Sequence, residues 1–491
     1  MRSSGVLLPL FSLPSPYGIG SMGKEAKKFI DFLKMSEQSY WQVLPLGWTS
    51  FGDSPYACVS TFAGGINYID LDELIQDGLL TYEEVQKQIT TNKYIDYAIL
   101  YNVRTPLLKS AFHRFKRQDN EAFDKFKKEN AFWLTDFTLF MSIKETLNGA
   151  SFNVWPEGLM LHDAKEVSEF AKNHQDLIDF YAFTQYIFFK QWQNIKDYAK
   201  EKGIKIIGDA PIYVAYDSSD VWGNYQLFDL DERRVPKKVA GVPPDYFSSD
   251  GQLWGNPLYR YDLMKKDNYQ WWIERLGQMA KMYDVIRLDH FRGFSGYWAI
   301  PYGDVNAKRG RWQKGPGFSF FQEIKKELPN LELILEDLGI LTSDVFALKK
   351  KVALPGMAVL QFGFGGEDSL HLPHNYVPKQ VAYPGTHDNQ TLRGWYESLD
   401  YQTRERVNHY LAIKENISFN DQAIRALYAS SADLVIIPIA DWLGLGDEAR
   451  INEPSTMGKN WQYRLDSQLI SEQLINKMRD YTITYHRYRR N

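Results

Sequence analysis

The sequence predicts an α/β protein, a (β/α)8 TIM barrel with large, mainly helical and loop-rich insertions after strands 2 and 3. Short apolar segments typical of buried parallel strands recur along the chain, helical stretches separate most of them, and several end in Asp, Glu or His. An open doubly wound sheet is the main alternative, but no Gly-x-Gly-x-x-Gly turn follows an early strand. The expected strands are 5–10, 40–46, 205–212, a short run starting at 285, 331–339, 356–364, 380–388 and 434–439.

Helical periodicity fills most of the intervals between these strands. Residues 24–35, for example, place Phe29, Ile30 and Leu33 on one face of an amphipathic helix. Residues 342–344, Thr-Ser-Asp, supply residue types that cap the start of a helix. The other expected helices lie within 121–134, 181–198, 268–283, 342–351, 402–430 and 466–487.

We expect one catalytic domain over residues 1–491, interrupted by two insertions. Residues 66–180 are rich in Lys, Glu and aromatic residues but contain few strand-like runs, which favours a mainly helical insertion after strand 2. Residues 213–268 favour a loop-rich insertion after strand 3. Long loops in compact proteins are usually functional or disordered, and the aromatic residues here argue against disorder.

Composition and charge argue against several classes of partner. The 57 basic and 61 acidic residues are interspersed and the net charge is −4, so neither nucleic acid nor a membrane surface is indicated. Cys58 is the only cysteine, which leaves no intramolecular disulfide. No run approaches the ~20 apolar residues of a membrane span, and prolines interrupt the first apolar run. We therefore expect a cytoplasmic protein without a cofactor, whose oligomeric state the sequence leaves open.

Polar residues at the ends of the predicted strands suggest a shared site, because the carboxyl ends of barrel strands face one pocket. Each group also has a structural explanation: a turn cap at the third strand, a helix cap at the fifth and an Asx-type turn at the seventh. Their recurrence at equivalent positions favours the shared site. The groups are Asp209 (third strand), Asp289 and His290 (fourth), Glu336 and Asp337 (fifth), and His387 and Asp388 (seventh).

Two of these carboxyls have different expected environments. Arg287 lies on the same face of the strand as Asp289, and a neighbouring cation favours an ionised carboxylate, although an ordinary ion pair would look the same. Glu336 follows the apolar run 333–335, and desolvation raises a carboxyl pKa. One ionised and one protonated carboxyl are what retaining glycosidic chemistry requires. The aromatic content of 15% suits sugar rings as well as a protein core.

A metal site for hydrolase or lyase chemistry is the alternative use of Asp, Glu and His at strand ends. The chain has neither a His-Glu-x-x-His motif nor a cysteine pair, and its nine His are scattered. Glycosidic chemistry therefore accounts better for the strand-end groups.

Several long motifs, in the same order along the chain, resemble those of the 4-alpha-glucanotransferases called amylomaltases or disproportionating enzymes. The resemblance extends from the first strand to Asn460–Trp461, nearly the whole chain. The motifs are WQVLPL at 41–46, GDSPY at 52–56, GDAPIYVAY at 208–216, PPDYF at 243–247, GNP at 255–257, RLDHFRG at 287–293, EDLG at 336–339 and GTHDN at 385–389.

The resemblance implies a retaining transglycosylase that acts on alpha-1,4-glucans such as maltooligosaccharides. By motif position, Asp289 is the nucleophile, Glu336 the general acid/base and Asp388 the carboxylate that grips sugar hydroxyls and distorts the ring. Tyr246 and Phe247 match a mobile lid over the glucan, although simple loop packing would also explain them. The implied substrate-binding residues are Tyr56, Asp209, Tyr246, Phe247, Arg287, His290, Asp337 and His387, with no metal ligands.

Some positions depart from the family pattern. Residues 63–66 read Ala-Gly-Gly-Ile instead of Ala-Gly-Asn-Pro, Ala440 replaces a Gln, and Glu453 and Ser455 replace the common Thr and Gly. These loops can shape outer glucan subsites, so donor and acceptor length preference stays open.

Two other functions compete with transfer. An alpha-amylase-like hydrolase would share the covalent intermediate and differ only in letting water attack it. A non-catalytic glucan-binding protein would be expected to have lost one of the three acids, and all three are present.

Overall fold

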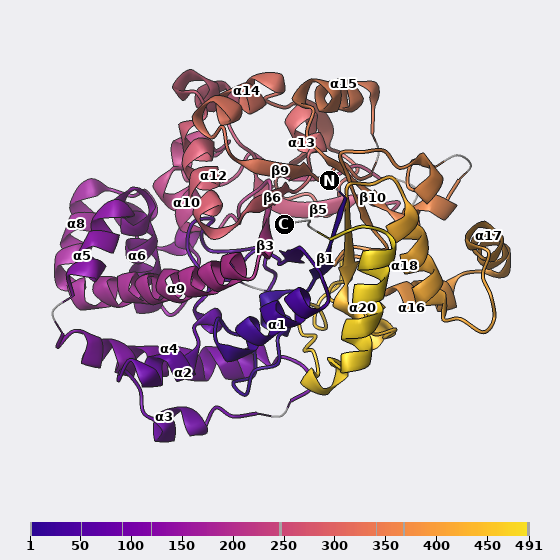
Figure 1. Ribbon diagram of the computed structural model, residues 1–491. Helices are drawn as coiled ribbons and strands as arrows, with labels where there is room; N and C mark the ends of the chain where they lie inside the picture. The colour runs from indigo at the N-terminus through magenta and orange to yellow at the C-terminus, as the bar shows by residue number, and fades with distance from the viewer. Residues whose placement is uncertain are drawn as a thin grey trace.

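The computed structural model describes residues 2–50, 52–90, 92–118, 120–244, 248–339, 341–366 and 369–488. Its centre is a parallel sheet with the strand order β10-β11-β12-β1-β2-β3-β6-β9 (Figure 1). The two ends of this sheet meet where the Leu335 amide donates to the Pro355 carbonyl at 2.8 Å, which nearly closes a barrel. The predicted (β/α)8 barrel is confirmed. Its strands are β1 Ser3–Leu7, β2 Tyr40–Gln42, β3 Lys205–Ala210, β6 Val285–Leu288, β9 Glu332–Leu335, β10 Gly356–Val359, β11 Gln380–Tyr383 and β12 Leu434–Pro438.

Helices surround the barrel on its outer side (Figure 1). Residues 24–35 form a single helix as predicted, and residues 402–430 form two. None of the helices in the described ranges is long and apolar enough to cross a membrane. The helices outside the 66–201 segment are α1 Lys24–Met35, α10 Ser219–Gly223, α11 Tyr261–Met264, α12 Gln270–Met282, α13 Arg292–Ser295, α14 Phe318–Glu327, α15 Ser343–Val352, α16 Leu392–Ser398, α17 Tyr401–Leu411, α18 Phe419–Ala429, α19 Ile439–Trp442 and α20 Glu472–Thr484.

A group of helices between β2 and β3 extends to one side of the barrel (Figure 1). The expected single helix at 121–134 is two helices, because the chain bends at Asn130, whose side chain donates to the Phe126 carbonyl and accepts from Trp133 Nε1. These local bonds compete with continuous helix. The helices are α2 Leu71–Gln76, α3 Tyr82–Gln86, α4 Tyr97–Phe115, α5 Glu121–Glu129, α6 Ala131–Thr146, α7 Glu157–Met160, α8 Ala164–Asn173 and α9 Gln175–Glu201.

A second, four-stranded antiparallel sheet has the order β5-β4-β7-β8 and was not predicted. Its first two strands lie in the segment expected to be loop-rich, and its last two follow β6. The strands are short and much of β5 and β8 is exposed, so they lack the apolar runs that identified the barrel strands. They are β4 Lys238–Val242, β5 Gln252–Pro257, β7 Gly296–Pro301 and β8 Arg311–Lys314.

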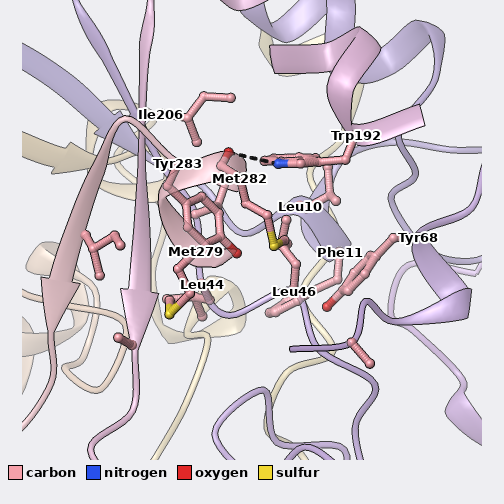
Figure 2. Close-up of a cluster of buried hydrophobic side chains, with 14 of the residues drawn as sticks. Leu10, Phe11, Leu44, Leu46, Tyr68, Trp192, Ile206, Met279, Met282 and Tyr283 are labelled. Atoms are coloured by element: carbon pink, nitrogen blue, oxygen red, sulfur yellow. Dashed lines mark hydrogen bonds between the residues drawn. The ribbon is translucent and has the colours of Figure 1, made fainter. Parts of the chain in front are cut away.

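A buried cluster fixes the long helix α9 and helix α12 against the barrel, as Figure 2 shows. Trp192 of α9 is 1% exposed, and its Nε1 donates to the Met282 carbonyl at 2.9 Å. Ile206 of β3, Tyr283 and Leu46 pack in the same cluster. Burying a large apolar side chain contributes about 1.5–3 kcal/mol. The packing therefore holds the starts of β3 and β6 firmly, which positions the residues at their carboxyl ends.

Candidate active site

A row of charged side chains lies where β3 and β6 end. The two strands pair in parallel with Asp209 opposite Arg287, so their side chains are neighbours. Arg287 Nη1 is 2.6 Å from Asp209 Oδ2 and 3.0 Å from Asp289 Oδ1. The Tyr56 hydroxyl also donates to Asp209 Oδ2, at 2.6 Å. One guanidinium thus holds two carboxylates, and Asp209 acts within this network rather than as a turn cap.

The charges in this row perturb one another. Withdrawal from water raises the pKa of Asp209 and of Asp289, and the Arg287 charge opposes both shifts. The negative charge of Asp388 raises the pKa of Asp289 further. The sequence predicted the Arg287 contact with Asp289. Burial, which the sequence did not reveal at this position, outweighs the effect of the cation on the pKa.

Glu336 lies at the end of β9, the strand beside β6. Its Oε2 accepts from the His290 amide at 2.7 Å, and its Oε1 accepts from the Leu338 amide at 3.0 Å. His290 has φ +50°, a left-handed turn conformation that directs its N–H toward Glu336. Desolvation and the charge of Asp289 raise the pKa of Glu336 to about 8. The raised pKa favours the protonated form of Glu336 beside a carboxylate held by a cation.

His290 is neutral in this environment. Burial and the nearby Arg292 lower its pKa to about 4. The Trp254 and His290 rings are T-shaped to each other with centroids 4.9 Å apart, and Trp254 is 37% exposed. His290 can therefore donate or accept a hydrogen bond without adding a charge to the site.

The opposite side of the site comes from the residues after β11. His387 is 4% exposed and stacks on Tyr56, with centroids 5.1 Å apart and an interplanar angle of 13°. Its Nε2 is 3.3 Å from Asp388 Oδ1, and burial lowers the pKa of His387. The side chain of Asp388 is 45% exposed. Tyr56 thus links the two sides, since it stacks on His387 and donates to Asp209.

Of the remaining predicted site residues, Asp337 lies apart from this network. Asp337 is 3% exposed; its carboxylate is paired with Lys349 and accepts from the Met357 amide at 2.7 Å. It therefore holds β10 and α15 and does not join the hydrogen-bond network of the other acids. Tyr246 and Phe247, the expected lid residues, lie outside the described residues.

Two residues at this site were missed in the sequence. Asn452 Nδ2 donates to Asp388 Oδ1 at 2.6 Å, and Arg450 Nη2 donates to the Asp388 carbonyl at 3.3 Å. Both lie in the loop that follows β12. In a (β/α)8 barrel the loop after each strand borders the same pocket, and this includes the loop after the eighth strand. This rule could have directed attention to the residues that follow β12.

Metal ligation can be judged from the grouping of side chains. Within the described ranges, no three His, Cys, Asp or Glu side chains converge closely enough to hold a metal ion. The acids at the strand ends instead contact Arg287, backbone amides and the Asn452 amide. This arrangement suits proton transfer and nucleophilic attack by carboxyl groups.

Comparisons with known proteins identify the family of this chain. The family model described as 4-alpha-glucanotransferase matches residues 8–470. A 4-alpha-glucanotransferase from Clostridium butyricum is 44% identical over 97% of this chain and 99% of its own length, and one from Thermus thermophilus is 43% identical over 94% and 95%. The solved structure of the amylomaltase from Streptococcus agalactiae in complex with acarbose aligns with a TM-score of 0.97 at 38% identity, covering 100% of both chains. The chain therefore belongs to the 4-alpha-glucanotransferase family of glucan-transferring enzymes.

Proposed function

We propose that this enzyme is a retaining 4-alpha-glucanotransferase that moves alpha-1,4-glucan segments between maltooligosaccharides through a covalent intermediate on Asp289. The observation that carries the proposal is the contrast between two carboxyls on adjacent strands. Asp289 lies 3.0 Å from the Arg287 guanidinium, whereas the pKa of Glu336 is raised to about 8. One is poised as a nucleophile and the other as an acid.

In the first step, protonated Glu336 donates its proton to the glycosidic oxygen while an Asp289 oxygen bonds to the anomeric carbon. The bond between that carbon and the glycosidic oxygen breaks, and the leaving sugar departs with a new 4-hydroxyl group. Asp289 is then an ester and carries no charge. Since the charge of Asp289 is one cause of the raised pKa of Glu336, that pKa falls at this point.

In the second step, Glu336 acts as a base. It accepts the proton of an incoming 4-hydroxyl group, whose oxygen attacks the anomeric carbon and displaces the Asp289 carboxylate. Two inversions at one carbon give retention and a new alpha-1,4 bond. If water attacked instead, the outcome would be alpha-amylase-like hydrolysis, the alternative function.

Asp388, in this proposal, grips hydroxyl groups of the reacting sugar and distorts its ring. Tyr56, Asp209, Arg287, His290 and His387 hold the same sugar. Contacts support this role: Tyr56, Asp209, Arg287 and His387 form one connected network around Asp289 and Asp388. The amide of His290 donates to Glu336 beside this network. Asp337, in contrast, supports the site indirectly, because it joins β10 and α15.

The substrates we propose are alpha-glucan donors and acceptors. The Streptococcus agalactiae relative was solved in complex with acarbose, which supports a sugar-binding cleft of this kind. Residues 1–491 act as one catalytic unit, with 66–180 and 213–268 as insertions and residues 246–247 as the lid. Glucan substrates and a single cysteine favour a cytoplasmic role in maltose and glycogen metabolism.

Product analysis with maltotriose separates transfer from hydrolysis. Transfer produces glucose and a ladder of longer oligomers while the total number of reducing ends stays constant. Hydrolysis produces reducing ends in step with bond cleavage, and that result would contradict the proposal. The same reaction with a chelator tests metal dependence, and we expect no loss of activity.

The covalent intermediate can be trapped with the Glu336→Gln variant and alpha-maltotriosyl fluoride. Fluoride leaves without a proton from Glu336, whereas attack by an acceptor still needs the missing base, so the glycosyl-enzyme accumulates. Mass spectrometry of the digested protein should find the sugar on the peptide that contains Asp289. A sugar on another peptide would assign the nucleophile elsewhere.

A further inference from the structure

The loop segment 450–452 contacts Asp388 through the side chains of Arg450 and Asn452. We propose that Asn452 is a positioning residue that holds the Asp388 carboxylate in one orientation for the reaction. This inference rests on the role of Asp388 proposed above, and it deepens that role by naming the group that fixes the carboxylate.

The contacts at Asp388 are asymmetric. Its Oδ1 accepts from Asn452 Nδ2 at 2.6 Å and lies 3.3 Å from His387 Nε2. No described residue hydrogen-bonds to Oδ2. Since the side chain is 45% exposed, one oxygen is held by the protein and the other remains open to the cleft. A carboxylate fixed through one oxygen can present the other to a pair of sugar hydroxyls.

Asn452 is itself held in place by its backbone. It is 9% exposed, its amide donates to the His387 carbonyl at 3.1 Å, and its carbonyl accepts from Arg450 Nε at 2.9 Å. The neighbouring Ile451 carbonyl accepts from the Trp461 amide at 2.8 Å. The backbone is therefore fixed on both sides of the side chain, which leaves the Asn452 amide little freedom to move away from Asp388.

Electrostatics explain why a neutral donor suits this position. Asp388 lies close enough to Asp289 for its negative charge to raise the pKa of Asp289. Asn452 holds Asp388 through a neutral donor, so it adds no positive charge that would compete with Arg287 for Asp289. Hydrogen bonds to charged groups are among the stronger ones in proteins.

The decisive variant is Asn452→Asp, which replaces the donor with a second carboxyl at hydrogen-bond distance from Asp388. Two carboxyls this close share one proton, so their joint pKa is raised. As the pH falls, the pair takes up this proton and the hydrogen bond to Asp388 is restored. We therefore expect the ratio of kcat for the variant to kcat for the wild type to rise, by up to about 10-fold per pH unit, as the pH is lowered from 8 toward 5.

Asn452→Ala removes the donor without adding a charge. We expect kcat to fall by about 10- to 100-fold, with a smaller change in KM and a ratio to wild type that varies little with pH. Asn460→Asp is the matched control, because Asn460 lies in the same loop but bonds to Glu453 and Thr456 and not to Asp388. Its kcat should stay near the wild-type value at every pH.

A role limited to folding would lower the melting temperature and give a kcat ratio for Asn452→Asp that is flat with pH. That result, or an Asn452→Ala variant with kcat within about threefold of wild type, would overturn the inference. Asp388→Asn is measured in parallel. If it stays active, the proposed role of Asp388 fails; if it is inactive while both Asn452 variants match wild type, only the role of Asn452 fails.

Discussion

Buried carboxyl groups occur in two regions of this enzyme, the cleft at the strand ends and the layer between the barrel and its outer helices. In the layer, Asp337 is matched by Lys349 and the Met357 amide. In the cleft, Asp209 Oδ1 is buried without a hydrogen-bond partner among the described residues, and acids raise one another's pKa.

The difference indicates what each region is for. Matched carboxyls hold elements together, because removing a partner leaves a buried charge uncompensated. Acids that face one another cost stability, and groups with perturbed pKa values are typical of catalytic sites. Glu336 and Asp337 are adjacent in the chain but belong to different regions. Variants of the two regions should therefore have opposite effects on activity and stability.

The largest effect is expected in the cleft. Asp289→Asn keeps the shape of the side chain but removes the nucleophile, and transfer from maltotriose should fall by about 10⁴-fold or more. Since the change also removes a charge in a desolvated site, the melting temperature should stay the same or rise. A large drop in melting temperature with substantial remaining activity would place Asp289 with the structural carboxyls.

Glu336→Gln should lower maltotriose turnover by about 10²- to 10⁴-fold, the usual contribution of a general acid and base. The first step with alpha-maltotriosyl fluoride should be affected far less, since fluoride leaves without protonation. A burst of fluoride release measures that step directly. Equal losses with both donors would show that Glu336 does not act as the proton donor.

The pH dependence gives a third comparison. The general acid must be protonated, so kcat/KM should fall about 10-fold per pH unit above the pKa of Glu336, near pH 8. On the acid side, activity should fall as Asp289 becomes protonated, at a pH above its ordinary range because withdrawal from water raises its pKa. A profile that stays flat through pH 9 would contradict the assignment of Glu336.

The smallest effect on activity is expected in the layer. Lys349→Met leaves the Asp337 carboxylate unpaired and should lower the free energy of unfolding by about 1–3 kcal/mol, less than for a fully buried pair because the Lys349 side chain is 31% exposed. Asp337→Asn should cost less, since its amide oxygen can still accept from the Met357 amide. Activity per folded molecule should stay within a few-fold for both variants, as denaturant unfolding and rate measurements can check.

The barrel could be predicted from the sequence because most of its strands are short apolar runs. The run 434–438 is apolar and almost wholly buried, whereas Arg311–Lys314 of β8 is mostly exposed and looks like a loop. The second sheet also pairs segments about 60 residues apart in the chain, such as Lys238 with Pro301, and no local pattern reports such pairing.

The strand ends predicted Asp209, Arg287 and Asp289 because register places neighbours on adjacent strands together. Side chains alternate between the two faces of a strand, so neighbours such as Glu336 and Asp337 are not expected to point into the same pocket. Because both residues are acids, both were nevertheless assigned to the site from the sequence. Asn452 could not be found this way. It reaches Asp388 from an irregular loop, and its position depends on the fold of residues 450–461.

The pairing of β4 with β7 has a practical consequence for engineering chimaeras. The hairpin of β4 and β5 precedes β6, and the hairpin of β7 and β8 follows it, yet they form one sheet. If only one hairpin were grafted from a relative, β4 and β7 would come from different proteins and would have to pair with each other. A chimaera designed to change product length should therefore exchange residues 238–257 and 296–314 together. The strand between them, which carries Arg287, would stay unchanged.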